Sequence, residues 1–411
     1  MASRSKIIDW AYLSTLSLYL FSSMISASKV IIYALVMLLF IFAIHYLKRK
    51  DVLCHQYFKW ITRFIIFSCF SLFWTISVYL SIWGIANAVI AIIPGISLYL
   101  FVNQKGQIHD VIIMFIVTTL FFTLYAISYF GLSSMGEGRF GDDVEVGLNS
   151  NTLAICLLYS IIGGVILSLR PTVIKLYKLI LWVICIIFLY VMLMTGCRKT
   201  LLMLFAIPVI YLFFKSKYKI ITLSIIALLV SVGVYFLFSI PILYDTIGVR
   251  LLEMVGMILE GGDAEGDVTR FFLYKYGFEW FLDKPLLGRG INTYRILSDA
   301  TPEFWGFNWY AHSNFVELLV DIGIIGTVLY FIWYYTCIKK NLHILNNTND
   351  KAQGNSSLFI VTLVLTFIIF ELFAVTYYDW FSQVFIAYMF ALTEFNLKSQ
   401  NSLAYEKVGF I

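Results

Sequence analysis

The residues of this chain that could do chemistry gather in one polar stretch, from Pro241 to Asp321. It holds the guanidinium groups of Arg250 and Arg270 and the imidazole of His312. Arginine offers paired donors that fit phosphate oxygens, and it never deprotonates. Histidine is the usual general base near neutral pH. The stretch therefore indicates anion binding beside a proton acceptor. The plainer alternatives are surface ion pairs and a histidine that only forms hydrogen bonds.

A second pair of cations stands between two apolar segments, where Arg198 and Lys199 occur in the sequence MTGCRKTLL. Charge next to hydrocarbon is costly and usually functional. Arg198 also lies near the start of the following apolar segment, where a helix N-terminus would add unpaired amide donors and a partial positive charge. We interpret the pair as an anion site. The alternative is that Arg198 reaches lipid phosphate.

Three further polar features follow in the same stretch. Arg289 lies between two glycines after a proline, and a tight turn is favoured there over a phosphate cradle. Glu317 and Asp321 are four residues apart and are expected on one face of a helix, about one and two turns after His312. Glu317 could orient or tune the imidazole. The plainer interpretation is that both acids line a polar crevice. The later glycines Gly323 and Gly326 are expected to permit close helix packing.

Composition places these residues in a membrane protein. The 411 residues are 61% hydrophobic and only 13% charged, whereas soluble chains carry about 25% charge. Apolar segments long enough to cross a bilayer recur along the chain. We predict an all-α, polytopic helical bundle with roughly 12 transmembrane helices. The expected spans are 8–26, 29–47, 61–81, 83–102, 110–130, 151–169, 179–196, 200–214, 219–240, 314–337, 357–376 and 381–397.

The distribution of charge predicts the topology. Most of the 29 Lys and Arg residues fall in alternate connections and in the terminal arms, so both termini are expected to be cytoplasmic. Four regions follow: helices 1–9 in residues 1–240 with a small outer loop at 131–150, a large outer loop at 241–313, helices 10–12 at 314–397, and a cytoplasmic tail at 398–411. Within the large loop, Phe271–Pro285 is expected to form an amphipathic interfacial helix that the proline ends.

The sequence indicates neither a metal site nor a cofactor. None of the six cysteines forms a pair with metal-ligand spacing, and the polar stretch carries no acidic metal-binding cluster. We expect no nucleic-acid partner. The partner that composition does indicate is membrane lipid.

Several motifs resemble the O-antigen polymerase and O-antigen ligase family of bacterial membrane glycosyltransferases. The strongest are KPLLGRGINTY and AHSNFVELLVDIGIIG, which match the family's proline, Gly-x-Gly turn and Tyr, and then its His and apolar span. TGCRKT resembles the family's small–Ser–Arg turn, with Cys197 in place of Ser. NSNTLA, which contains Asn151, resembles the Asn at the start of a span. One departure is that Ser313 separates His312 from Asn314.

The resemblance implies metal-independent, inverting glycosyl transfer at the outer face of the bacterial inner membrane, from a glycan on undecaprenyl pyrophosphate. Carried over by motif, Arg198 and Arg270 would hold the pyrophosphate, and His312 would deprotonate or orient the acceptor hydroxyl. Seven further residues would contribute to substrate binding: Lys199, Arg250, Arg289, Tyr310, Asn314, Glu317 and Asn151.

Within the family, we expect a polymerase that joins repeat units into O-antigen, capsular polysaccharide or exopolysaccharide. A chain-length regulator protein would be a possible partner. The alternative is an O-antigen ligase that passes finished glycan to lipid A-core or another acceptor. A transporter or flippase is a more distant alternative, because the chain shows no internal repeat and its acids lie near the ends of spans instead of the bilayer midplane. An inert scaffold would not account for Arg198.

Overall fold

The computed structural model describes residues 2–47, 55–135, 140–143, 148–170, 172–241, 244–249, 252, 265–302 and 308–401. These residues form an all-α protein, and the single β-bridge among them, between Asp143 and Leu148, is isolated. Arg250 lies outside the described residues, as do 136–139 and 144–147 of the small outer loop and 242–243, 251, 253–264 and 303–307 of the large outer loop. The predicted fold class is confirmed.

The twelve expected spans correspond to twelve helices of the structure. The first nine are α1 (Ala2–Met24), α2 (Lys29–Tyr46), α3 (Gln56–Phe70), α4 (Val78–Lys105), α5 (Ile108–Phe130), α6 (Ser150–Leu169), α7 (Lys175–Met194), α8 (Arg198–Lys215) and α9 (Lys219–Ser239). The last three are α14 (Asn314–Asn347), α15 (Lys351–Glu371) and α16 (Trp380–Asn401).

Among the described residues, eight of these helices are long and apolar enough to cross a membrane: α2, α4, α5, α6, α7, α9, α14 and α15. The other four pack into the same bundle. α1 packs on α2 and α5, α3 on α14, α8 on α15, and α16 on α4. The core of the bundle is rich in aromatic side chains, such as Trp333, which stacks 4.2 Å from Phe390 between ring centroids.

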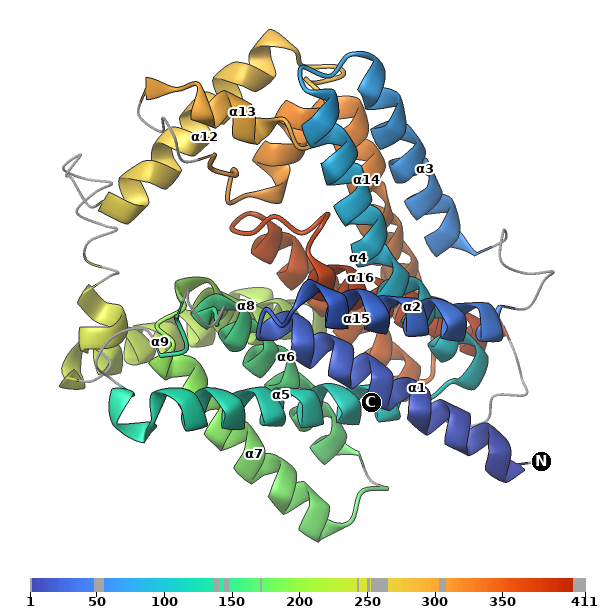
Figure 1. Ribbon diagram of the computed structural model, residues 1–411. Helices are drawn as coiled ribbons and strands as arrows, with labels where there is room; N and C mark the ends of the chain where they lie inside the picture. Colours follow the sequence, from blue (N-terminus) through green and yellow to red (C-terminus); the bar gives the residue numbers. More distant parts are fainter. Residues whose placement is uncertain are drawn as a thin grey trace.

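Two shorter helices, α12 (Glu265–Asp283) and α13 (Tyr294–Asp299), come from the large loop and lie beside α14 (Figure 1). α12 ends just before Pro285, as the sequence predicts. Its Leu273 is fully buried in a small apolar cluster with Tyr294 and Val316. The Tyr294 hydroxyl donates to the Leu273 carbonyl at 2.6 Å. This cluster fixes α12 and α13 on the start of α14.

The expected span at 61–81 is wrong, because the helix breaks inside it. α3 ends at Phe70, a 3₁₀ turn follows, and α4 starts only at Val78. Tertiary contacts cause the break. The Trp74 indole donates to the Leu287 carbonyl at 3.0 Å, and the Ile76 amide donates to the Arg289 carbonyl at 3.0 Å. The continuous apolar sequence gave no sign that this backbone would bond to the distant outer loop.

Contact with the same loop explains the backbone conformation of Gly323. This glycine has φ +64° and ψ −174° inside α14, a conformation that disfavours other residues. A Cβ there would clash with the backbone of Leu286. Past the kink, the Ile324 amide donates to the Pro285 carbonyl at 2.8 Å instead of to its own helix. Gly323 therefore admits a loop backbone, and the expected close packing against another helix is wrong for this residue.

The connections sort to two ends of the bundle. The expected inner connections meet at one end, where three polar contacts join distant helices: Lys105–Asp9 at 3.2 Å, His55–Glu394 at 3.0 Å, and Lys398–Asn103 at 3.2 Å. The α1–α2 turn, the start of α6 and the residue before α14 meet at the other end, around one cavity. Which end faces the cytoplasm stays a prediction.

Candidate active site

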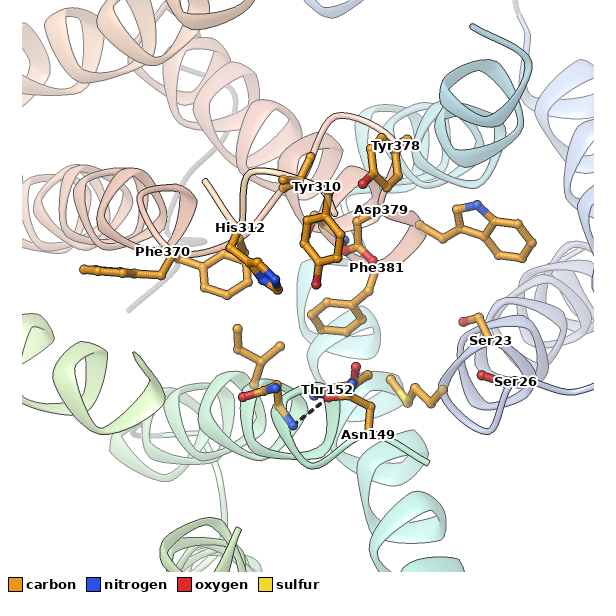
Figure 2. Close-up of a pocket in the computed structure, with 18 of the residues that line it drawn as sticks. Ser23, Ser26, Asn149, Thr152, Tyr310, His312, Phe370, Tyr378, Asp379 and Phe381 are labelled. Atoms are coloured by element: carbon orange, nitrogen blue, oxygen red, sulfur yellow. Dashed lines mark hydrogen bonds between the residues drawn. The ribbon is translucent and has the colours of Figure 1, made fainter. Parts of the chain in front are cut away.

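A cavity of about 620 Å³ opens at the end of the bundle where the expected outer connections meet. Its walls come from the α1–α2 turn, the starts of α6, α8 and α16, the residues before α14, and the connection between α15 and α16. Figure 2 shows His312, Tyr310 and Asp379 on one side of the space and Asn149 and Thr152 on the opposite side. A volume of this size is typical of small-molecule sites.

Three helix N-termini contribute lining residues to this cavity. α6 begins beside Asn149, whose side-chain oxygen accepts the amides of Asn151 at 2.8 Å and Thr152 at 3.3 Å. α8 contributes Lys199, its second residue. α16 begins beside Asp379, which accepts the Ser382 amide at 2.8 Å. The positive ends of helices favour anions, so a negatively charged ligand is stabilised here except close to the Asp379 carboxylate.

The His312 side chain lines the cavity because the backbone around it is held in an unusual shape. His312 has φ +54°, a left-handed conformation that costs free energy in a non-glycine residue. Contacts on both sides maintain it. The Ala311 amide donates to the buried Glu317 carboxylate at 2.9 Å, and Ser313 caps α14 by accepting the Val316 amide at 3.5 Å. The serine that separates His312 from Asn314 is thus a helix cap.

The electrostatic environment keeps His312 neutral. The pKa of its imidazole is lowered to about 3, and burial is the largest cause. Three nearby cations add to this lowering of the pKa, in decreasing order Arg270, Lys199 and Arg295. The ring packs 4.0 Å from the Tyr310 ring, between centroids. A neutral imidazole can accept a proton, and the cations around it can hold an anion.

Two cations in the cavity are held in place by uncharged partners. The Lys199 ammonium donates to the Phe373 carbonyl at 3.3 Å and lies 5.6 Å from the centre of the Phe370 ring. The Arg295 guanidinium donates to the Tyr378 hydroxyl at 3.1 Å and covers the Tyr310 ring at 5.4 Å. Lys199 was among the predicted substrate-binding residues, as was Tyr310.

Sequence reasoning missed Arg295, Tyr378 and Asp379, and it also missed Lys29, another lining cation. The available signal for Arg295 was its position directly after the motif GINTY. That signal was weak, because Arg289 lies in the same segment and has the same chemistry.

The other predicted cations lie elsewhere. Arg198 is half-buried at the start of α8 and is not a lining residue, although its neighbour is. Arg270 is exposed on α12 and acts on the cavity through its charge. Arg289 pairs with Asp283 at 2.9 Å and does not line the cavity. Arg250 lies outside the described residues. Asn151, a further predicted residue, does line the cavity.

Asn314 is fully buried and forms hydrogen bonds that connect two segments of the site. Its amide group donates to the Glu371 carboxylate at 3.2 Å, and its oxygen accepts the amides of Thr376 at 3.2 Å and Tyr377 at 3.4 Å. These bonds tie the start of α14 to the connection that carries Tyr378. The geometry indicates a positioning role, and direct substrate binding by Asn314 stays a prediction.

The two acids of α14 do not line a crevice, so that expectation is wrong. Glu317 and Asp321 are both fully buried. The Asp321 carboxylate accepts the backbone amides of Asn292 at 2.6 Å, Thr293 at 3.0 Å and Tyr294 at 2.8 Å. Both carboxylates accept hydrogen bonds from backbone amides of the loop. These bonds replace the hydrogen bonds to water that the acids and the amides lose on burial.

The Gly-x-Gly turn is therefore a structural turn. Gly288 and Gly290 both have positive φ, +66° and +105°. The Gly290 amide donates to the Asp321 main-chain carbonyl at 2.7 Å, so it is already occupied. As the sequence indicates, a tight turn is favoured over a phosphate cradle. The turn places α13 so that Arg295 lines the cavity.

Among the described residues, no group of three or more His, Cys, Asp or Glu side chains could hold a metal ion. The absence of a metal and of a cofactor remains a prediction. The chemistry available in the cavity is that of a neutral imidazole, fixed cations, helix N-termini, and the hydroxyl and amide groups of the opposite wall.

The fold and this site define a class: a multi-pass helical membrane protein with a cationic cavity between helix ends. The sequence model of a family described as O-Antigen ligase matches residues 183–331, from within α7 to within α14. That segment contains Lys199, Arg270, Arg295 and His312. Over this segment the chain is similar to the O-antigen ligase family.

The chain is also similar to a protein of Rickettsia conorii described as "Putative polysaccharide ligase". The two are 26% identical over 91 residues, which is 20% of this chain and 22% of the relative. The chain thus matches about a fifth of the relative's length. Both comparisons agree with the resemblance drawn from the motifs, and neither separates a polymerase from a ligase.

Proposed function

We propose that this protein transfers a glycan from a polyprenyl pyrophosphate to an acceptor hydroxyl. The observation that carries the proposal is a neutral His312 among fixed cations in one cavity. Such a site combines what the reaction needs: positive charge for the leaving diphosphate and an acceptor for the hydroxyl proton. The similarity of residues 183–331 to the O-antigen ligase family supports the choice of a lipid-linked glycan as donor.

In the proposed step, His312 accepts the proton of the acceptor hydroxyl as its oxygen attacks the anomeric carbon. The new glycosidic C–O bond forms while the bond from the anomeric carbon to the phosphate oxygen breaks, with inversion. The electron pair of the broken bond leaves with the polyprenyl diphosphate. Cations stabilise the charge that develops there. We assign this role to Lys199, Arg198 and Arg270, the last two from the motif resemblance.

The low pKa of His312 fits a base that acts only when the donor is bound. The positive charges of Arg270, Lys199 and Arg295 disfavour the imidazolium. A bound diphosphate would offset those charges and raise the pKa of His312, so that proton transfer becomes easier. The protein would then couple donor binding to activation of the acceptor.

Two acceptors fit this chemistry. We propose, as the sequence analysis did, a polymerase whose acceptor is another lipid-linked repeat unit, working at the outer face of the bacterial inner membrane with both termini in the cytoplasm. A chain-length regulator would be its partner. A ligase is the second candidate, and the descriptions of the matching family and of the Rickettsia relative favour it.

The test is a gel of surface glycan from a deletion strain, with the gene restored as wild type or as His312→Ala. His343→Ala is the matched control, because His343 is exposed at the expected inner end of α14. Loss of the long ladder with a single repeat left on the core indicates a polymerase. Long polymer that accumulates on the lipid carrier indicates a ligase. Normal glycan from a His312→Ala protein that is present in the membrane would refute the mechanism.

A further inference from the structure

Arg295 is a charged side chain that the proposed reaction does not yet use. It comes from α13, lines the cavity and is half-buried. Its recorded polar contact is the 3.1 Å bond to the Tyr378 hydroxyl, and its Nε is buried and has no hydrogen-bond partner among the described residues. A guanidinium has five N–H donors, so most of its capacity is unused.

The charge of Arg295 has no counter-charge in contact. Within the described part of the chain it forms no ion pair, and the nearby Glu317 carboxylate accepts the Ala311 amide instead. Burial raises the pKa of Tyr378, so its hydroxyl stays neutral at physiological pH and does not compensate the cation. Burial disfavours the cation, but Tyr378 and the nearby Glu317 charge favour it more, so the pKa of Arg295 is raised. No carboxylate of the described residues contacts the guanidinium, so its remaining N–H donors are available to a ligand.

Arg289, in the same loop, also has a buried Nε without a hydrogen-bond partner in the described part of the chain, but its charge is matched by a carboxylate. It pairs with Asp283 at 2.9 Å, and Asp283 is 68% exposed. Arg295, six residues later, instead faces the cavity that holds His312 and Lys199. The turn clamped by Asp321 fixes α13 and therefore the origin of the Arg295 side chain.

We propose that Arg295 is a direct ligand of the donor's diphosphate, and that Tyr378 and Tyr310 hold its guanidinium ready for binding. This inference rests on the proposed function and adds to it a residue that no motif marks. A planar guanidinium stacked on one tyrosine and bonded to another loses little freedom when it binds, and its free edge can contact two phosphate oxygens at once.

The experiment measures binding of undecaprenyl pyrophosphate to the purified full chain in detergent micelles, with undecaprenyl monophosphate as the second probe. Arg295→Ala should weaken pyrophosphate binding by about 10- to 100-fold, the loss expected for a charge-assisted contact. Arg295→Lys keeps the charge but loses the paired donors, so it should fall in between. Tyr378→Phe should also fall in between, because it removes the bond that holds the guanidinium. Arg289→Ala is the matched control and should bind like wild type.

The outcomes separate the two proposals. If wild type binds neither probe, the proposed donor class fails. If wild type binds and Arg295→Ala binds equally well, the assignment of Arg295 is overturned while the proposed function stands. Equal weakening by Arg295→Ala and Arg289→Ala also overturns it, since a general disturbance of the loop would then explain both. If Arg295→Ala does not fold, Arg295→Lys with wild-type affinity for both probes overturns the paired-donor contact.

Discussion

The three backbone hydrogen bonds that the Asp321 carboxylate accepts lead to a quantitative prediction for Asp321→Asn. In the wild type, one carboxylate oxygen accepts the Asn292 amide at 2.6 Å and the other accepts those of Thr293 and Tyr294. An asparagine can keep one of these acceptors, but its NH₂ group then faces an amide donor in a fully buried position. With the oxygen kept opposite Thr293 and Tyr294, the Asn292 amide loses its acceptor and the new NH₂ group has none, at about 1–3 kcal/mol for each of these two donors. We expect the loop to lose about 3 kcal/mol of local stability.

Hydrogen–deuterium exchange of the peptide that covers residues 286–300 measures this loss. A change of about 3 kcal/mol in the opening free energy makes exchange faster by about 100-fold. Asp283→Asn is the control, since the Asp283–Arg289 ion pair is largely exposed on the acid's side and such pairs contribute about 0–1 kcal/mol. Its exchange should change by less than about fivefold.

The result that would refute the reasoning is Asp321→Asn exchange within the range of the Asp283→Asn control. The Gly-x-Gly segment would then be held by its other contacts, to α3 and α4, and Asp321 would need another explanation. Because α13 carries Arg295, we also expect Asp321→Asn to reduce the long glycan ladder in cells, whereas Asp283→Asn should leave it unchanged.

Three further predictions address the base, the kink and the topology. Since the pKa of His312 is about 3 in the free protein, lowering the pH from 7 to 5 should not reduce the initial rate at low donor concentration through this residue; a histidine with a pKa of 6.5 would lose about 30-fold, and such a loss would contradict the assignment. Gly323→Ala should destabilise the protein by at least about 1 kcal/mol and reduce the ladder, because φ is +64° and a loop backbone fills the space of a Cβ. Gly233→Ala is the control, because the nearest atom to its added Cβ is the Phe205 ring at 3.6 Å; equal thermal unfolding of the two variants would be evidence against this account. Reporter fusions at about residues 265 and 345 should read outside and inside respectively, and the reverse would overturn the argument from charge.

The helices were predictable because bilayer-length apolar segments carry a strong signal in one dimension. Where prediction failed, distant contacts decided the structure. The apolar run across Trp74 gives no hint that its indole bonds to Leu287. Nor does the sequence show that Gly323 leaves the helical conformation to admit Leu286. Both failures involve the same loop, whose path depends on residues more than 200 positions away as well as on α14.

The sequence predicted which kinds of side chain the site contains, but not which individual residues line the cavity. His312 was found because it is the one histidine that the charge pattern places outside, and Lys199 because a cation next to hydrocarbon is conspicuous. Spacing alone cannot say that Arg295 enters the cavity while Arg289 pairs with Asp283. Nor does it show that Asn314 turns towards Glu371. Those outcomes depend on the direction in which each side chain leaves its turn.

The origin of the cavity walls also bears on the biosynthesis of the protein. Lining residues range from Ser23, at the end of the first helix, to Ser382, at the start of the last. A growing chain therefore has His312 and its cations well before it has a closed site, since Tyr378 and Asp379 emerge from the ribosome after them. The cavity is complete only when α16 has been inserted, so a prematurely terminated chain would lack part of its wall.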